Sequence, residues 1–427
     1  MVGVIGVVVL LVLMYARMWI GLTMVFVGFW GLISITRVDT ALAVLATVPY
    51  RTVADYPITA VPLFVLMGVV VSNMGVGRDL YYAAYKWIGH LRGGLAMATV
   101  AACAGFAAVC GSSAAAAVTM AKVAMPEMKK YRYSDRLSSG AVVAGGTMGI
   151  LIPPSMGFIL YGILTGASIG HLFMAGILPG ITQAIFYIVT IYLVCRFNPQ
   201  MGLPGPKADF KERILSLKSI WMMVILFLLV IFGIYLGIFS PTEAGAIGAF
   251  GSIVLTYMAR RLKGRNLVEA IVEAGRTTAM IILLIVGAFV FANFMAISKL
   301  PTALGEFVSS VSVSRYAVLA AIIVLYILLG MFLDVFSCII FTVPIFYPVI
   351  VALGFDSIWY GVLMVRIIEI GLITPPVGMN AFLVSGVTGT PVGTIFRGSI
   401  PFIIADFFHI VLLITVPAIS LFIPSMM

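Results

Sequence analysis

Apolar runs long enough to cross a lipid bilayer recur from one end of this 427-residue chain to the other. A membrane-spanning helix needs roughly 17–25 predominantly apolar residues, whereas soluble domains carry about 25% charged residues. Only 9% of the residues here are charged, and 63% are hydrophobic. The composition therefore excludes a water-soluble globule and predicts an all-α polytopic membrane protein.

The N-terminal run and the cysteines exclude two further classes. The run MVGVIGVVVLLVLMYARMWIGL has neither a basic start nor a small-residue cleavage site, so we expect a retained span and no signal peptide. The cysteines lie in or beside apolar segments without a CxxC spacing, which indicates neither a disulfide framework nor a zinc site. They are Cys103, Cys110, Cys195 and Cys338.

The net charge of +10 is concentrated between the apolar runs, and such basic loops are typical of the cytoplasmic side of a membrane protein. This distribution does not favour a nucleic-acid partner. Placing every basic cluster inside the cell predicts that both chain termini lie outside. The clusters are Arg78, Lys86 and Arg92; Lys129, Lys130, Arg132 and Arg136; residues 196–218; and Arg260, Arg261, Lys263 and Arg265.

In this orientation one order of elements occurs twice: span, surface helix, re-entrant hairpin, broken span, span. The first copy begins outside and the second inside, which predicts inverted repeats. Inverted repeats with interrupted helices at matching positions are typical of secondary transporters. The predicted parts are scaffold spans within 1–61; a first repeat, 62–195, with its hairpin at 94–130 and break near 145–157; a basic linker and scaffold spans within 196–279; and a second repeat, 280–427, with a span at 280–297, a hairpin at 314–350 and a break near 369–380.

Paired prolines mark both breaks, in GILIPPSMG at 149–157 and GLITPPVGM at 371–379. Proline removes an amide donor and clashes with the preceding helical turn. A single such site is compatible with a simple proline kink. Two matched sites, each preceded by a hairpin, favour unwound backbone lining a cavity, where free carbonyl groups suit a cation and free amides suit an anion.

The predicted hairpin tips carry polar residues at the same depth. Ser112 and Ser113 follow a glycine turn where a helix would begin, so ordinary capping is the alternative to a role as ion ligands. The second tip, in GMFLDVFSCIIFTVPIFYP, offers Asp334, and a carboxylate at membrane depth is normally functional or paired. The second break adds Glu369, Thr374 and Asn380.

At these residues the chain resembles the large transmembrane permease subunit of tripartite ATP-independent periplasmic (TRAP) transporters. The resemblance implies an elevator-type, sodium-driven importer of organic acids in the bacterial cytoplasmic membrane. It also implies a small four-helix membrane partner and a periplasmic substrate-binding protein. The motifs that carry it are GSS with AMPEMKK, GGTMGILIPPS, YGILTGASIGHLFMAGILPG, SPTEAGAIGA, GMFLD with TVPIFYP, and EIGLITPPVGMNAFLVSG.

The sequence contains no motif of a metalloenzyme or of an ATP-driven pump. Proton coupling remains an alternative to sodium coupling. None of the histidines (His90, His171 and His409) begins an HExxH metal motif, which disfavours a membrane metalloenzyme. The chain has no Gly-Lys dipeptide for an ATP phosphate loop. Proton coupling through Asp334 or Glu369 is the alternative to sodium, because membrane carboxylates often relay protons.

We expect two sodium sites, one where each tip meets a break, and no cofactor besides this coupling ion. The first is predicted at Gly111, Ser112, Ser113, Gly145, Thr147, Gly149, Ile152 and Pro153. The second is predicted at Gly330, Phe332, Asp334, Gly371, Thr374 and Pro375. The predicted substrate contacts are Ser113, Pro154, Ser155, Arg366, Pro376 and Asn380.

Arg366 lies inside the last broken span, where the resembled family is expected to carry an uncharged residue. Residues three apart share a helix face, so pairing with Glu369 is the favoured interpretation. Pairing with Asp334, snorkelling to the membrane surface and contact with a substrate carboxylate are the alternatives.

Overall fold

The computed structural model describes residues 1–261, 264–310 and 314–427 and contains helices but no strand within these ranges. Six of the described helices are long and apolar enough to cross a membrane. The prediction of an all-α polytopic membrane protein is confirmed.

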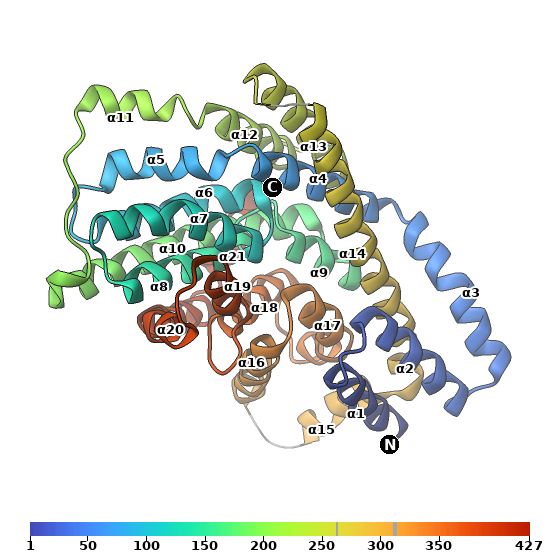
Figure 1. Ribbon diagram of the computed structural model, residues 1–427. Helices are drawn as coiled ribbons and strands as arrows, with labels where there is room; N and C mark the ends of the chain where they lie inside the picture. Colours follow the sequence, from blue (N-terminus) through green and yellow to red (C-terminus); the bar gives the residue numbers. More distant parts are fainter. Residues whose placement is uncertain (262–263, 311–313) are drawn as a thin grey trace.

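The N-terminal and central helices form one side of the molecule (Figure 1), where α14 packs along α2 and α4. The helix α3 extends from the edge of the molecule and buries only Ala41 and Thr52. The helices outside the repeats are α1 (Val2–Tyr15), α2 (Ile20–Ile35), α3 (Val38–Ala54), α11 (Phe210–Leu217), α12 (Trp221–Tyr235) and α13 (Pro241–Met258).

The same order of helices then occurs twice: a long helix, a shorter one, a helix pair, an interrupted helix and a final long helix. In the first set these are α4 (Ala60–Asn73), α5 (Val76–Ile88), α6 (Gly94–Cys110), α7 (Ser113–Lys130), α8 (Asp135–Gly146), α9 (Met156–Thr165) and α10 (Ile169–Phe197). In the second they are α14 (Gly264–Ser298), α15 (Leu300–Ser310), α16 (Arg315–Phe332), α17 (Val335–Ala352), α18 (Ser357–Gly371), α19 (Met379–Thr388) and α20 (Val392–Thr415), followed by α21 (Ala418–Leu421).

The two sets agree down to single hydrogen bonds at the ends of α9 and α19. Thr165 donates its hydroxyl proton to the Tyr161 carbonyl at 2.7 Å and accepts from the Ala167 amide at 3.3 Å. Thr388 donates to the Val384 carbonyl at 2.8 Å and accepts from the Thr390 amide at 3.3 Å. A left-handed glycine follows each threonine. The same Thr-Gly pair therefore ends the equivalent helix of each set in the same way.

Two elements differ from the sequence-based expectation. The apolar runs predict scaffold spans within 1–61, but they do not indicate the helix α3 at 38–54, because Pro49 and the charges of Asp39 and Arg51 interrupt its apolar pattern without breaking the helix. The span predicted at 280–297 is the second half of α14, which begins at Gly264. The first turns of α14 carry Glu269 and Glu273, and these charges hide the helix from a search for apolar runs.

The amphipathic helix α5 is tied to segments distant in the sequence. Lys86 forms an ion pair with Glu212 of α11 at 2.9 Å, and this hydrogen-bonded partner raises the pKa of Lys86. The Trp87 indole donates to the Arg213 carbonyl at 3.1 Å, and Asp79 forms an ion pair with Arg261. These contacts hold α5 against α11 and the end of α13.

The inverted-repeat hypothesis makes a direct prediction about membrane sidedness. On a background without the natural cysteines, Arg260→Cys beyond α13 should react with a membrane-impermeant maleimide only from the cytoplasm. Ala303→Cys on α15 should react only from outside, because α14 crosses the membrane between them. Both side chains are exposed, so burial does not limit the reaction. Labelling of both positions from one side would contradict the inverted arrangement.

Candidate functional site

The first interruption lies between α8 and α9. Helix α8 ends at Gly146, a single 3-10 turn covers Thr147–Gly149, and α9 begins at Met156. Ser155 caps α9 by accepting from the Phe158 amide at 3.3 Å and donates its own proton to the Ile150 carbonyl. The segment between the helices is therefore closed by a side-chain bond and buried almost throughout.

The tip between α6 and α7 packs directly on this segment. A methyl group at Gly149 would come within 2.7 Å of the Ser112 carbonyl oxygen, a distance that atoms do not tolerate. Ser112 caps α7 by accepting from the Ala115 amide at 3.4 Å. The tip and the first break are therefore in backbone contact, and only glycine fits at position 149.

The residues predicted for the first cation site surround this contact. Ser113 and Thr147 are buried, at 3% and 0% exposure, while Ile152 is partly exposed. Gly145 packs against Cys103 of α6 and Gly111 faces Pro154 and Met156. Pro153 follows Ile152 in the segment that the Ser155 bond closes. The structure thus brings Gly111, Ser112, Ser113 and Gly149 to one junction, whereas Gly145 packs about two turns from the tip, and the cation site itself stays a prediction.

The tip between α16 and α17 meets the second interruption, residues 372–378, in the same manner. A methyl group at Gly371 would come within 2.5 Å of the Gly330 carbonyl carbon. The Gly378 amide donates to the Met331 carbonyl at 3.2 Å across the junction. The two glycines that the sequence places at tip and break are thus each other's neighbours.

Asp334 of this tip caps α17. One carboxylate oxygen accepts from the amides of Phe336 at 3.1 Å and Ser337 at 3.3 Å, and the other accepts from the Ser337 hydroxyl. No lysine or arginine among the described residues forms an ion pair with Asp334. The carboxylate is therefore held by hydrogen bonds, and its negative charge has no cationic partner in the part of the chain that the structure describes.

The remaining residues predicted at the second junction differ in exposure. Pro375 and Pro376 are exposed, and Phe332 is 61% exposed. Thr374 is partly buried and donates to the Ile370 carbonyl at 2.7 Å. The side-chain nitrogen of Asn380, Nδ2, is buried without a hydrogen-bond partner among the described residues. The second break is thus more open than the first.

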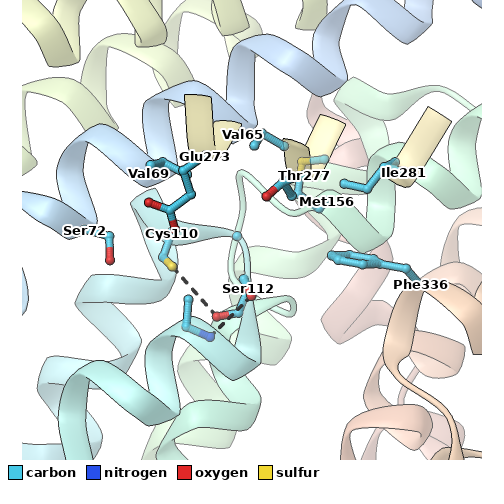
Figure 2. Close-up of a pocket in the computed structure, with 13 residues that line it drawn as sticks. Val65, Val69, Ser72, Cys110, Ser112, Met156, Glu273, Thr277, Ile281 and Phe336 are labelled. Carbon is cyan, nitrogen blue, oxygen red and sulfur yellow. Dashed lines mark hydrogen bonds between the residues drawn. The ribbon is translucent and has the colours of Figure 1, made fainter. Parts of the chain in front are cut away.

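A cavity of about 150 Å³ lies between the first tip and the helices α4 and α14. Figure 2 shows Glu273 and Thr277 reaching from α14 towards Cys110 and Ser112 of the tip. Met156 of α9 and Phe336 of α17 complete the wall, so both repeats contribute.

Glu273 is a functional candidate that sequence reasoning missed. It is the only charged residue lining this cavity among the described residues, and it accepts from the Asn73 amide group at 3.3 Å. The sequence does contain an indication of its position, because acidic residues one turn before a long apolar run mark where a helix leaves water. The sequence alone does not show that the chain brings this turn against Ser112.

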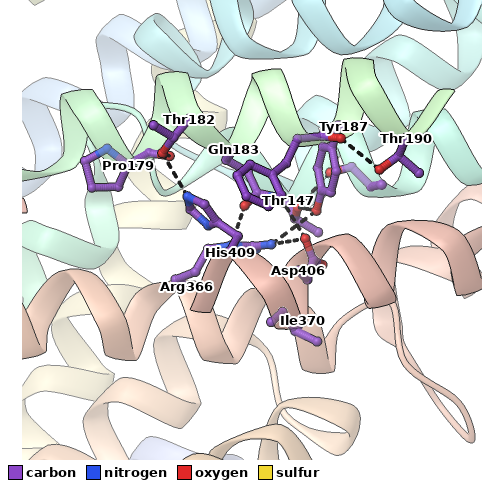
Figure 3. A network of polar contacts seen from close by, with 12 residues as sticks. Thr147, Pro179, Thr182, Gln183, Tyr187, Thr190, Arg366, Ile370, Asp406 and His409 are labelled. Carbon is purple, nitrogen blue, oxygen red and sulfur yellow. Dashed lines mark hydrogen bonds and ion pairs between the residues drawn. The ribbon is translucent and has the colours of Figure 1, made fainter. Parts of the chain in front are cut away.

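The structure corrects the interpretation of Arg366. Its guanidinium is fully buried and forms an ion pair with Asp406 of α20, not with Glu369 or Asp334 (Figure 3). Burial also keeps Arg366 away from the membrane surface, so the snorkelling alternative is wrong, while contact with a substrate carboxylate stays a prediction. The predicted Arg366–Glu369 pair does not form, because the neighbouring helix α20 places the Asp406 carboxylate directly against the guanidinium.

Glu369 is left in an unusual environment by this pairing. It is fully buried, and neither carboxylate oxygen has a hydrogen-bond partner among the described residues. Its polar neighbours are the Arg366 guanidinium and the Ser113 hydroxyl. Glu369, which belongs to the helix α18 that leads into the second break, therefore lies close to the first tip.

No group of three or more histidine, cysteine, aspartate or glutamate residues in the described ranges could hold a metal ion. Any cation bound at the two junctions would depend on hydroxyl, carboxylate and backbone oxygens.

Comparison with known proteins agrees with the motifs. A profile of the family described as "Tripartite ATP-independent periplasmic transporter, DctM component" matches residues 7–419. The C4-dicarboxylate TRAP transporter large permease protein DctM of Pseudomonas aeruginosa is 34% identical over 382 residues, covering 89% of each chain. The sialic acid TRAP transporter large permease protein SiaM of Vibrio cholerae is 30% identical, covering 97% of this chain and 96% of the relative.

A solved structure supports the fold. The YdaH transporter of Alcanivorax borkumensis superposes with a TM-score of 0.63 at 16% sequence identity, covering 88% of each chain. At this identity the likeness concerns the arrangement of helices alone.

Proposed function

The chain belongs to the DctM component family of tripartite ATP-independent periplasmic transporters, and on this premise we propose that it imports an organic acid by coupling to sodium. The relatives are permeases, and a permease moves its substrate without changing it. In the proposed cycle the two tips and breaks move as one body against the helices α4 and α14. The substrate binds at the junctions of that body, beside the cavity that separates the first tip from those helices.

The observation that carries the proposal is the pair of glycine contacts, Gly149 on Ser112 and Gly371 on Gly330. The first contact brings the break after α8 to the start of α7, and the second brings the end of α18 to the last turn of α16. Sodium prefers hard oxygen ligands and can be held largely by neutral carbonyl groups. Free helix amides beside it suit a carboxylate. One junction can therefore bind the coupling ion and favour an anionic substrate next to it.

The substrate class rests on the relatives and on the cavity. The two relatives are named for C4-dicarboxylates and for sialic acid, which are carboxylates. We place the substrate carboxylate at Ser113, Pro154 and Ser155 of the first junction, with Pro376 and Asn380 reaching it from the second. The unpartnered Asn380 side-chain nitrogen supports this placement, because a buried donor without a hydrogen bond is costly.

The proposed partners follow from the tripartite family. A small four-helix membrane subunit would cover the scaffold side, where α1, α3 and α12 expose large apolar side chains such as Val12, Leu42 and Phe232. A soluble binding protein would deliver the substrate from the periplasm to this permease in the inner membrane of a bacterium.

Uptake into proteoliposomes tests the proposal. With the small subunit and the loaded binding protein, a labelled C4-dicarboxylate should accumulate only under an inward sodium gradient. The purified chain alone should show no uptake above protein-free vesicles, because the delivery and scaffold surfaces are incomplete. Full uptake by the chain alone would contradict the partner assignment, and accumulation in sodium-free buffer would contradict the coupling ion.

Proton coupling is the second candidate, and Glu369 is the observation that favours it. Glu369 is fully buried and its oxygens accept no hydrogen bond from the described residues, so a negative charge there is costly and the group could bind and release a proton during transport. Under this alternative an imposed pH gradient would drive uptake without sodium, and Glu369→Gln would abolish that response. Under sodium coupling Glu369→Gln would leave the sodium requirement in place.

A further inference from the structure

We infer that Arg366 is a positioning residue for the first cation site. Through the Tyr187 hydroxyl it fixes the turn at Thr147–Gly149, whose carbonyl groups lie at the first junction. The inference rests on the proposed function in taking this junction as a sodium site. It adds that the second repeat, which contributes Arg366, sets the ion affinity of the first.

The guanidinium sits in a closed ring of side chains from three helices (Figure 3). Arg366 Nε donates to Gln183 Oε1 of α10 at 3.0 Å, and its Nη2 pairs with Asp406 of α20. Gln183 Nε2 in turn donates to Asp406 Oδ1 at 2.7 Å. All three side chains are fully buried, so the ring holds the guanidinium in one place without competition from water.

From this ring one chain of hydrogen bonds reaches the first break. Arg366 Nη2 also donates to the Tyr187 hydroxyl at 3.3 Å, and Tyr187 lies 3.1 Å from the Thr147 hydroxyl. Thr147 Oγ1 lies 2.6 Å from the Ala144 carbonyl, which can only accept. The single Thr147 proton is therefore used there, and Tyr187 must donate to Thr147. Along this series of hydrogen bonds, from Arg366 through Tyr187 and Thr147 to Ala144, each group donates to the next one.

This direction leaves Thr147 Oγ1 with one lone pair free and fixes the side chain at both ends. The 3-10 turn that begins at Thr147 ends at Gly149, which presses on the Ser112 carbonyl group. The turn is therefore held by Tyr187 on one side and by the first tip on the other. Without the Tyr187 hydroxyl the turn keeps its tip contact but loses the anchor that sets its orientation.

Tyr187→Phe tests the inference because it removes one hydroxyl and leaves the Arg366–Asp406 pair intact. The readout is the sodium concentration that gives half of the maximal thermal stabilisation of the purified full chain, with choline chloride as the ionic control. A net hydrogen bond is worth about 0.5–1.5 kcal/mol, so we expect this concentration to rise roughly two- to tenfold. The substrate concentration for half-maximal uptake of a labelled C4-dicarboxylate, at saturating sodium, should stay unchanged.

The matched control is Thr182→Val. Thr182 also lies on α10 and bonds across to α20, through His409 Nε2 at 2.9 Å, but this contact does not reach the Thr147 turn. Its sodium response should equal that of the natural chain. A double variant, Arg366→Met with Asp406→Leu, removes the ring while avoiding a lone buried charge. It should shift the sodium response as far as Tyr187→Phe, and adding Tyr187→Phe to it should shift it no further.

These measurements distinguish a failure of the sodium site from a failure of the positioning role of Arg366. A natural chain that sodium does not stabilise more than choline overturns the sodium assignment and the positioning role together. A normal sodium response that Tyr187→Phe leaves unchanged, or that Thr182→Val shifts equally, overturns the positioning role alone.

Discussion

Replacing Asp334 with asparagine is expected to lower sodium-driven uptake about tenfold or more, since hydrogen bonds and contacts of charged groups are worth about 1.5–3 kcal/mol. Asp334 caps α17 at the second junction, and its charge is not neutralised by any cationic side chain in the described residues. We expect a sodium ion to supply the missing positive charge. Uptake should fall without control passing from sodium to pH.

Asparagine is the informative substitution because it caps helices about as well as aspartate does. Asp334→Asn removes the charge and keeps an oxygen for the Phe336 and Ser337 amides. Asp334→Ala removes both and should cost a further ~1 kcal/mol of stability through the lost cap. The control is Asp356→Asn, because Asp356 caps α18 by accepting from the Trp359 amide at 2.8 Å, away from both junctions. Uptake by Asp334→Asn at the level of Asp356→Asn would show that Asp334 is only a cap.

Asp406→Ala is expected to have the largest effect on stability. It leaves the Arg366 guanidinium fully buried and without its counter-charge, and breaking a buried pair in this way costs about 3–5 kcal/mol. The free energy of unfolding of the purified chain in detergent would measure the loss.

The double variant Arg366→Met with Asp406→Leu separates the pair from the isolated charge. Apolar replacement of a whole buried pair is often neutral or stabilising, so the double variant should be far more stable than Asp406→Ala. A double variant as unstable as the single one would mean that the ring with Gln183, and not the uncompensated charge, provides the stability.

Both interruptions could be located from the sequence because their causes are local. Paired prolines cannot continue a helix, and a glycine beside each pair permits the backbone contact with a tip. The match between the two repeats was readable for the same reason, since Thr165-Gly166 and Thr388-Gly389 make identical helix ends. Features that depend only on neighbouring residues, such as these breaks and helix ends, can be predicted from the sequence without knowing how the helices pack.

The polar network could not be predicted, because its partners meet only through packing. Arg366 and Asp406 lie on different helices, and helical spacing pointed instead to Glu369 on the same helix. The carboxylate in the apolar run IADFFH was itself a signal, since an ionisable residue at membrane depth needs a partner. Glu273 was hidden in the same way, because no local pattern encodes the cavity that α14 shares with the first tip.

The long helix α14 makes the arrangement of the protein sensitive to the thickness of the bilayer. Its 35 residues extend about 52 Å, whereas the hydrocarbon core of a bilayer is about 30 Å thick. The apolar half at 280–297 extends about 27 Å and matches the core, so the charged first turns with Glu269 and Glu273 extend beyond it. Because α2 and α4 pack along α14, they share whatever angle the bilayer imposes on it. Longer acyl chains would set the helix more upright and carry the α4 side of the cavity with it. The thickness of the surrounding membrane thereby helps to set the shape of the cavity.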